Sequence, residues 1–115
     1  MENYSTALNK AFHALSDPTR RAVLTRLLAG PASVTELAEP FAMGLPAFMK
    51  HIHVLEECDL IASQKQGRTR TCHLNTQQLA SAEHWLVQQR AVWEARTDRL
   101  AQYAEALAHK EPEND

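Results

Sequence analysis

The 115-residue sequence predicts a mainly helical domain that carries one small β-hairpin. Its composition is that of an ordinary globular protein, with 44% hydrophobic and 23% charged residues. Only three glycines occur, and most of the chain keeps its apolar residues at helical spacing. A short region between residues 60 and 74 has strand-like character instead, which accounts for the hairpin.

Two helices are expected at the N-terminal end. Residues 4–15 hold apolar side chains at i, i+3, i+4 and i+7, the spacing of one helix face. A second helix is expected over residues 18–29, because Asp17 can cap it and a proline at its start loses no hydrogen bond. Gly30 and Pro31 then end this helix.

The next two helices are short and separated by a turn. Thr35 is expected to cap a helix over residues 36–41, in which Pro40 would clash with the carbonyl four residues earlier and so shorten or bend it. A turn follows at residues 43–46, and the next helix runs over residues 45–58. Two short helices joined by a brief turn are the outline of a helix-turn-helix.

The hairpin and the last helix complete the chain. Residues 60–65 and 69–74 read as two strands joined by a basic turn, which must pack on the helices because a lone hairpin is marginal in water. Residues 76–109 contain no glycine or proline and repeat apolar residues every seven positions. Such a seam requires a partner helix. Gln89 and Arg96 interrupt it, which argues against a tight continuous coiled coil.

The helix over residues 45–58 has two unlike faces. Phe48, Ile52 and Leu55 recur at i, i+4 and i+7 and should face the core. The second helix of a helix-turn-helix enters the major groove of DNA, and a basic hairpin beside it can contact the backbone or a minor groove. The side chains expected to contact double-stranded DNA are Leu45, Pro46, Met49, Lys50, His51 and His53 of the helix and Gln64, Lys65, Arg68 and Arg70 of the hairpin.

Each of these residues also has a simpler interpretation, as part of the core or as solvated surface, and for a single residue the two have similar weight. The order of helix, turn, helix and basic hairpin favours DNA. The charge distribution agrees with this. The whole chain has a formal charge of −2, whereas residues 18–75 hold seven Lys or Arg against five Asp or Glu. The negative total predicts weak, salt-sensitive non-specific binding.

Several motifs together resemble the ArsR family of winged-helix repressors. They are Ala-Leu-Ser-Asp-Pro-Thr-Arg-Arg at 14–21, Glu-Leu-Ala at 36–38, the segment 45–61 and Gly-Arg-Thr-Arg at 67–70. The resemblance covers residues 7 to 107 and implies a winged helix-turn-helix homodimer that represses transcription at a near-palindromic operator in a bacterial or archaeal cytoplasm. It also implies that the first and last helices of each subunit form the dimer interface. The implied interface residues are Tyr4, Leu8, Phe12, Leu79, Leu86, Trp93, Leu100, Tyr103 and Leu107.

The sequence departs from the family in two ways. Gly44 and Met49 stand where members usually have polar residues, so their DNA sequence preference is not carried over. Metal-sensing members have cysteines before the turn or paired Asp, His and Glu along the last helix, and this chain has neither motif. It therefore resembles the members without metal ligands, and neither a metal nor another cofactor is expected. Cys58 and Cys72 are expected to be small buried residues.

Other classes of protein find little support. The sequence has no nucleophile with a base motif and no glycine-rich phosphate loop, so an enzyme is not expected. It has neither a membrane-length apolar stretch nor a secretion signal, and two cysteines fit a reduced cytoplasm. We expect one domain over residues 1–110, with dimerising terminal helices, and a disordered acidic tail at 111–115.

Two alternatives stay open. One is a winged-helix module that binds a partner protein and reads no DNA, for which the apolar Leu45 and Met49 would also be suited. The other is a repressor that responds to a metal, a thiol oxidant or a small molecule. The sequence does not name an effector.

Overall fold

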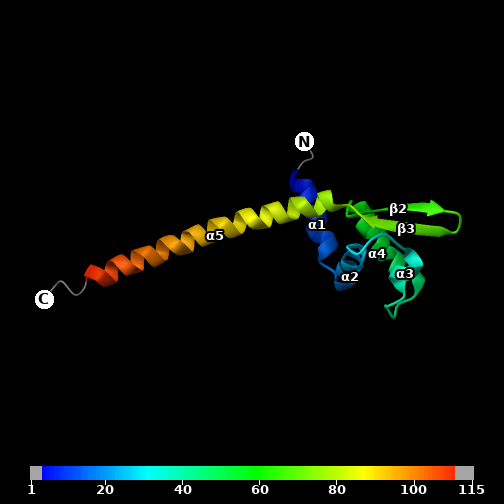
Figure 1. The fold of residues 1–115 in the computed structure, drawn as a ribbon, viewed down its shortest axis with the longest axis horizontal. Helices are drawn as coiled ribbons and strands as arrows, with labels where there is room; N and C mark the ends of the chain where they lie inside the picture. Colours follow the sequence, from blue (N-terminus) through cyan, green and yellow to red (C-terminus); the bar gives the residue numbers. More distant parts are fainter. Residues whose placement is uncertain (1–3, 111–115) are drawn as a thin grey trace. The chain divides into compact units, whose positions relative to one another are not determined.

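The computed structural model describes residues 4–110. The predicted class, mainly helical with a hairpin, is confirmed (Figure 1). The chain divides into two units, one ending at Ala82 and one beginning at Glu83. The predicted acidic tail lies outside the described residues. The elements are α1 (Tyr4–Leu15), α2 (Pro18–Leu27), β1 (Ala32–Ser33), α3 (Val34–Ala38), α4 (Leu45–Glu57), β2 (Ile61–Gln66), β3 (Thr69–Leu74) and α5 (Thr76–Lys110).

Helices α1 and α2 begin where the sequence predicts. The side chain of Asp17 caps α2 by accepting a hydrogen bond from the backbone N–H of Arg20 at 3.0 Å. Pro18 occupies the first turn, where its missing N–H costs nothing. The helix ends at Leu27, two residues before the predicted end, and Gly30 then takes a φ of +135°, which suits glycine.

Helix α3 differs from the prediction. The cap is Ser33 and not Thr35: the Ser33 hydroxyl accepts from the Glu36 N–H at 3.1 Å, and the Glu36 carboxylate accepts from the Ser33 N–H at 2.9 Å. This reciprocal arrangement is a capping box. The helix then ends at Ala38, before Pro40, so the expected clash does not arise. The predicted Thr35 cap and the extension to residue 41 are therefore wrong.

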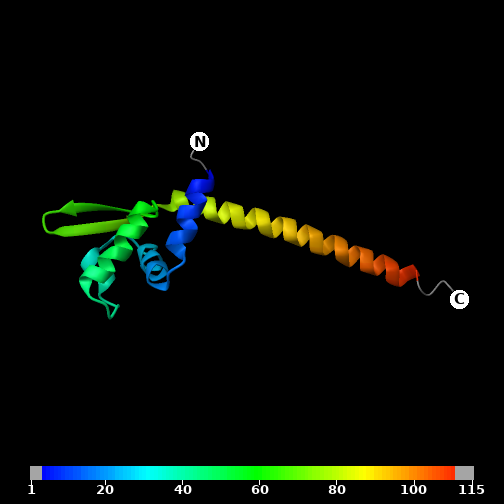
Figure 2. The same cartoon turned by 180° about the vertical axis from the view of Figure 1, so that it is seen from behind.

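The sheet has a strand that the sequence pattern did not reveal. Its antiparallel order is β1-β3-β2, with Ala32 opposite Cys72 and Ile61 opposite Leu74. Strand β1 is only two residues long, too short to show an alternating pattern. Strands β2 and β3 form the predicted hairpin, whose turn lies beyond the helices of the first unit in both views (Figures 1 and 2). Gly67 permits this turn with a φ of +65°.

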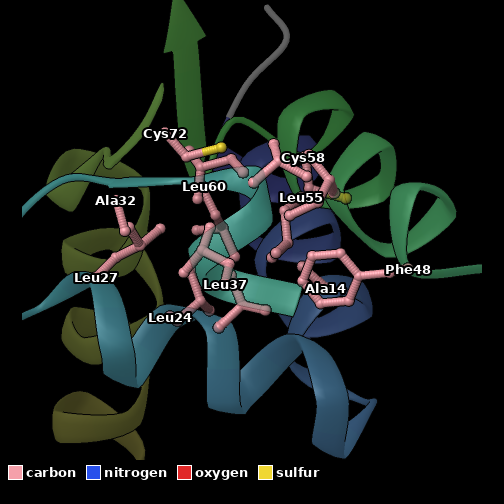
Figure 3. Packing of buried hydrophobic residues seen from close by; sticks show 14 residues of the cluster. Ala14, Leu24, Leu27, Ala32, Leu37, Phe48, Leu55, Cys58, Leu60 and Cys72 are labelled. Atoms are coloured by element: carbon pink, nitrogen blue, oxygen red, sulfur yellow. The ribbon is translucent and has the colours of Figure 1, made fainter. Parts of the chain in front are cut away.

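The core of the first unit lies between the helices and the sheet. Phe48, Ile52 and Leu55 of α4 are all 0% exposed, which confirms the predicted inner face of this helix. In Figure 3 the side chains of Phe48 and Leu55 from α4 lie beside Leu37 of α3. Cys58 and Cys72 are buried in the same cluster, as predicted. The core thereby fixes α4 with one face inward and one face outward.

The second unit is the part of α5 that follows Ala82. Every described side chain from Leu86 to His109 is exposed. An i, i+4 ion pair joins Arg90 and Glu94 at 3.2 Å. Among the described residues, no helix combines the length and the apolar character needed to cross a membrane.

Candidate nucleic-acid interface

The outer face of α4 presents four of the predicted DNA-contacting side chains to solvent. Leu45, Pro46, Lys50 and His53 are exposed, whereas Met49 is half-buried and packs against the core. The N-cap residue of α4 is Gly44, which has no side chain to cap the helix. No side chain therefore bonds the N–H groups of its first turn, and Pro46 in that turn has no N–H.

The hairpin divides the side chains predicted to contact DNA between its two faces. Lys65 lies opposite Arg70 in the register, on the face that also carries the buried Cys72. Gln64 lies opposite Thr71 and therefore on the other face. The structure thus places Lys65 and Arg70 on the side of the core helices and Gln64 on the far side, a distinction that the sequence analysis did not make.

Like charges directly opposite each other destabilise a sheet, so the Lys65–Arg70 pair costs folding stability. Part of this cost is offset through Ser63. The Arg70 guanidinium donates to the Ser63 hydroxyl at 2.9 Å, and that hydroxyl in turn donates to the Glu56 carboxylate of α4. Arg70 is therefore linked through Ser63 to α4. Within the described residues, Lys65 and Arg68 make no ion pair and no side-chain hydrogen bond.

A hollow of about 410 Å³ joins the start of α4 to the hairpin. It brings together five of the residues predicted to contact DNA, namely Leu45, Met49, Lys65, Arg68 and Arg70. Four residues that the sequence analysis missed complete the lining, namely Ser33, Val34, Thr35 and Thr69. The Ser-x-x-Glu spacing of the capping box was the available signal for the first three, because it places the start of α3 at Ser33.

His51 is placed away from this hollow. It is half-buried, with its Nδ1 at 3.4 Å from an Arg20 guanidinium nitrogen and 3.6 Å from an Asp17 carboxylate oxygen. The first contact requires Nδ1 to accept and the second requires it to donate, so the tautomer of His51 decides which of the two partners it bonds. We therefore leave His51 out of the proposed DNA face and assign it to the junction of α1, α2 and α4.

Arg20 is the centre of that junction. Its side chain is 9% exposed, and it donates to the carbonyl oxygens of Ala14 at 2.9 Å and His13 at 3.0 Å. It thereby satisfies the last carbonyls of α1. Burial alone would raise the pKa of Asp17, but the Arg20 N–H and the charges of His51 and Arg20 outweigh this and lower it. The junction thereby joins α4 to α1 and α2.

The two thiols have an environment unlike that of a reactive site. Burial raises the pKa of Cys58 and, in the same way, that of Cys72, which keeps both in the neutral thiol form. Within residues 4–110, no three His, Cys, Asp or Glu side chains gather as a metal site would require.

The residues predicted for a dimer interface fall into two groups. Leu8 and Leu79 are half-buried in the first unit, where Phe12 is 36% exposed. The side chain of Tyr4 lies outside the described residues. The others lie on the exposed part of α5 and are 47% to 66% exposed, namely Leu86, Trp93, Leu100, Tyr103 and Leu107.

Comparison with known proteins gives relatives along most of the chain. A family model described as a helix-turn-helix domain matches residues 15–64. The transcriptional repressor SdpR of Bacillus subtilis (strain 168) is 31% identical over 80 residues, which span 70% of this chain and 89% of SdpR. A crystal structure of an ArsR family transcriptional regulator is 54% identical and matches with a TM-score of 0.76 over 82% of this chain and 97% of its own. An ArsR-like transcriptional regulator from Rhodococcus sp. RHA1 is 32% identical, with a TM-score of 0.70 over 85% of this chain and 92% of its own.

Proposed function

The chain belongs to the ArsR family of winged helix-turn-helix transcriptional regulators, and on that premise we propose that it represses transcription as a homodimer bound to a near-palindromic operator. The observation that carries this proposal is the hollow where α4 meets the basic hairpin, because it joins a groove-reading helix to three cations. The name of the relative SdpR supports repression as the direction of control. A cytoplasmic location follows from access to DNA, and no catalytic role is assigned.

In the proposed complex, α4 lies in a major groove. Lys50 and His53 on its outer face donate to guanine N7 and O6 or to phosphates, which are the acceptors that such side chains reach. The hairpin is the wing, and Lys65 and Arg68 contact the adjacent backbone. Arg70 adds charge at the base of the wing while Ser63 and Glu56 hold it against the helix.

The homodimer is proposed from the exposed apolar stripe on α5. Large side chains left exposed along one helix mark an interaction surface, and a second copy offers the same stripe. Two recognition helices related by a two-fold axis would then read half-sites one helical turn apart, about 34–36 Å.

The first experiment is a fluorescence-anisotropy titration on DNA from upstream of the chain's own gene, beside a scrambled duplex, at two salt concentrations, with and without a chelator. We expect tight binding to the upstream fragment only, unchanged by the chelator. A fall in affinity on chelation would show instead that a metal controls binding. Binding to neither duplex at low salt would favour the protein-interaction module.

The residues are tested with the double variant Lys50→Ala with Arg68→Ala. We expect the operator affinity to fall about 10- to 100-fold, and the salt slope to fall by about 0.9 for each phosphate that the variant no longer neutralises. The matched control is Arg26→Ala with Arg99→Ala, which removes the same charge from exposed positions outside the proposed face. Equal reductions in both variants would show a general charge effect and contradict the assigned site.

A further inference from the structure

We propose that the hollow between α4 and the wing reads thymine, with Leu45 and Met49 packing against the 5-methyl group of the base. The inference rests on the proposed function and deepens it, because it names the base that the recognition helix selects. Three observations support it: the apolar side chains in the hollow, the three cations that line it, and the chemistry of the four base edges.

The apolar part of the hollow comes from one helix face. Leu45 and Met49 are four residues apart on α4 and therefore lie one above the other. Leu45 is 56% exposed although it is a large apolar side chain at the start of a helix directed at DNA. Met49 is half-buried, and its inner part packs on the core, which holds it in place. Val34 adds a third apolar side chain from α3.

The cations that line the same hollow come from the wing. Lys65, Arg68 and Arg70 all line the hollow, and the opposed Lys65–Arg70 pair costs stability until an anion approaches. An apolar patch bordered by positive charge fits a ligand that is apolar at one point and anionic around it. A duplex presents this combination in its major groove, where a thymine methyl lies between phosphate backbones. A wholly apolar protein segment would leave the three charges without counterions.

The base edges themselves differ in what they bring to an apolar surface. In the major groove only thymine presents a methyl group, whereas cytosine presents an amino donor, guanine two acceptors and adenine an acceptor and a donor. A polar edge pressed against Leu45 and Met49 would lose its water without gaining a hydrogen bond, which costs affinity. Thymine at this point is therefore favoured over the other three bases.

The test removes the methyl group alone. Duplexes that bind the full-length protein are first enriched from a random 30-base-pair pool, and each thymine of the enriched sequence is then replaced by deoxyuridine. We expect one position in each half-site where the replacement weakens binding about fourfold, or about fifteenfold when both half-sites are changed, as the transfer of one methyl group predicts.

Three variants assign the effect to residues. In Leu45→Ala, which changes an exposed side chain, and in Met49→Gln, which keeps the side-chain length, the deoxyuridine penalty should fall below twofold. In the control Lys50→Ala all duplexes should bind more weakly while the penalty stays. Two results would overturn the thymine assignment and leave DNA binding intact. One is a set of enriched duplexes with no fixed thymine, and the other is a deoxyuridine penalty below twofold in the unaltered protein. A pool with no enriched duplex would overturn both proposals.

Discussion

Helices α4 and α5 both carry a stripe of large apolar side chains, but only one stripe is buried within the chain. In α4, Phe48, Ile52 and Leu55 are 0% exposed because α2, α3 and the sheet enclose them. In α5 the corresponding large side chains are 47% to 66% exposed, namely Leu86, Trp93, Leu100, Tyr103 and Leu107.

The difference shows that a periodic apolar stripe predicts burial without saying which chain supplies the other surface. Burial is driven by the area removed from water and has no preferred direction. The first unit completes its core with its own elements, whereas the stripe on α5 has area left for another molecule. We therefore expect substitutions in the two regions to change different measurements.

The largest effect is expected for Trp93→Asp, which tests the exposed stripe. Trp93 is 66% exposed, so a charge there costs little folding stability in the free chain. In a two-fold dimer the same charge blocks burial of this position in both copies. We expect the dimer dissociation constant to rise at least about 100-fold. Sedimentation across a range of protein concentrations measures it, with the exposed Gln88→Asp as control. An unchanged dissociation constant would move the dimer interface off this stripe.

The next effect is expected for Arg20→Ala, which tests the closed first unit. The substitution leaves the carbonyl oxygen of Ala14 without its buried donor, whereas the carbonyl oxygen of His13 keeps the N–H and the hydroxyl of Ser16 as donors. We expect the free energy of unfolding to fall by about 2–4 kcal/mol. Denaturant unfolding measures it. The control Arg21→Ala removes an exposed guanidinium that bonds one carbonyl, and its cost should stay below about 1 kcal/mol. Equal costs would mean that burial of Arg20 adds nothing to stability.

A smaller effect is expected for the thiols of the same unit. Burial raises the pKa of Cys58 and of Cys72, so less thiolate is present near pH 8 than in the unfolded chain. We expect a disulfide reagent to react with the folded protein at least about tenfold more slowly than with the denatured protein, and faster as the pH rises. Rapid reaction of both thiols in the folded state would show that the core opens readily.

The smallest effect is expected at the capping box. Hydrogen bonds from the Ser33 backbone and hydroxyl lower the pKa of Glu36, so its folded value lies below the unfolded one. Its stabilising contribution is therefore present above about pH 4 and is lost as the pH falls through the folded value. Glu36→Gln keeps a capping acceptor without the charge, so this variant should be less stable than the unaltered protein at neutral pH, and the difference in the free energy of unfolding should shrink as the pH falls through the folded pKa. Denaturant unfolding at several pH values measures this difference. A difference that stays constant with pH would assign the pH dependence of stability to other carboxyl groups, such as Asp17.

Much of the fold could be predicted from local patterns. The i, i+4, i+7 spacing of Phe48, Ile52 and Leu55 identified the inner face of α4, and Asp17 with Pro18 located the start of α2. Both signals act within one or two helical turns, so they depend only on residues close together in the sequence. The capping box was also local, and the choice of Thr35 over Ser33 shows that a competing cap within two residues can mislead.

The sequence by itself determined the helices, the hairpin and the residue types of the candidate site. Only the tertiary structure decided which of them meet. It placed Lys65 and Arg70 on the hairpin face that also carries the buried Cys72, and Gln64 on the opposite face. It directed His51 towards Asp17 and Arg20. It also added β1, which exists through its pairing with Cys72 and Thr71 about forty residues later in the chain. Such pairings depend on the packing of segments that are distant in the sequence, so local periodicity does not reveal them.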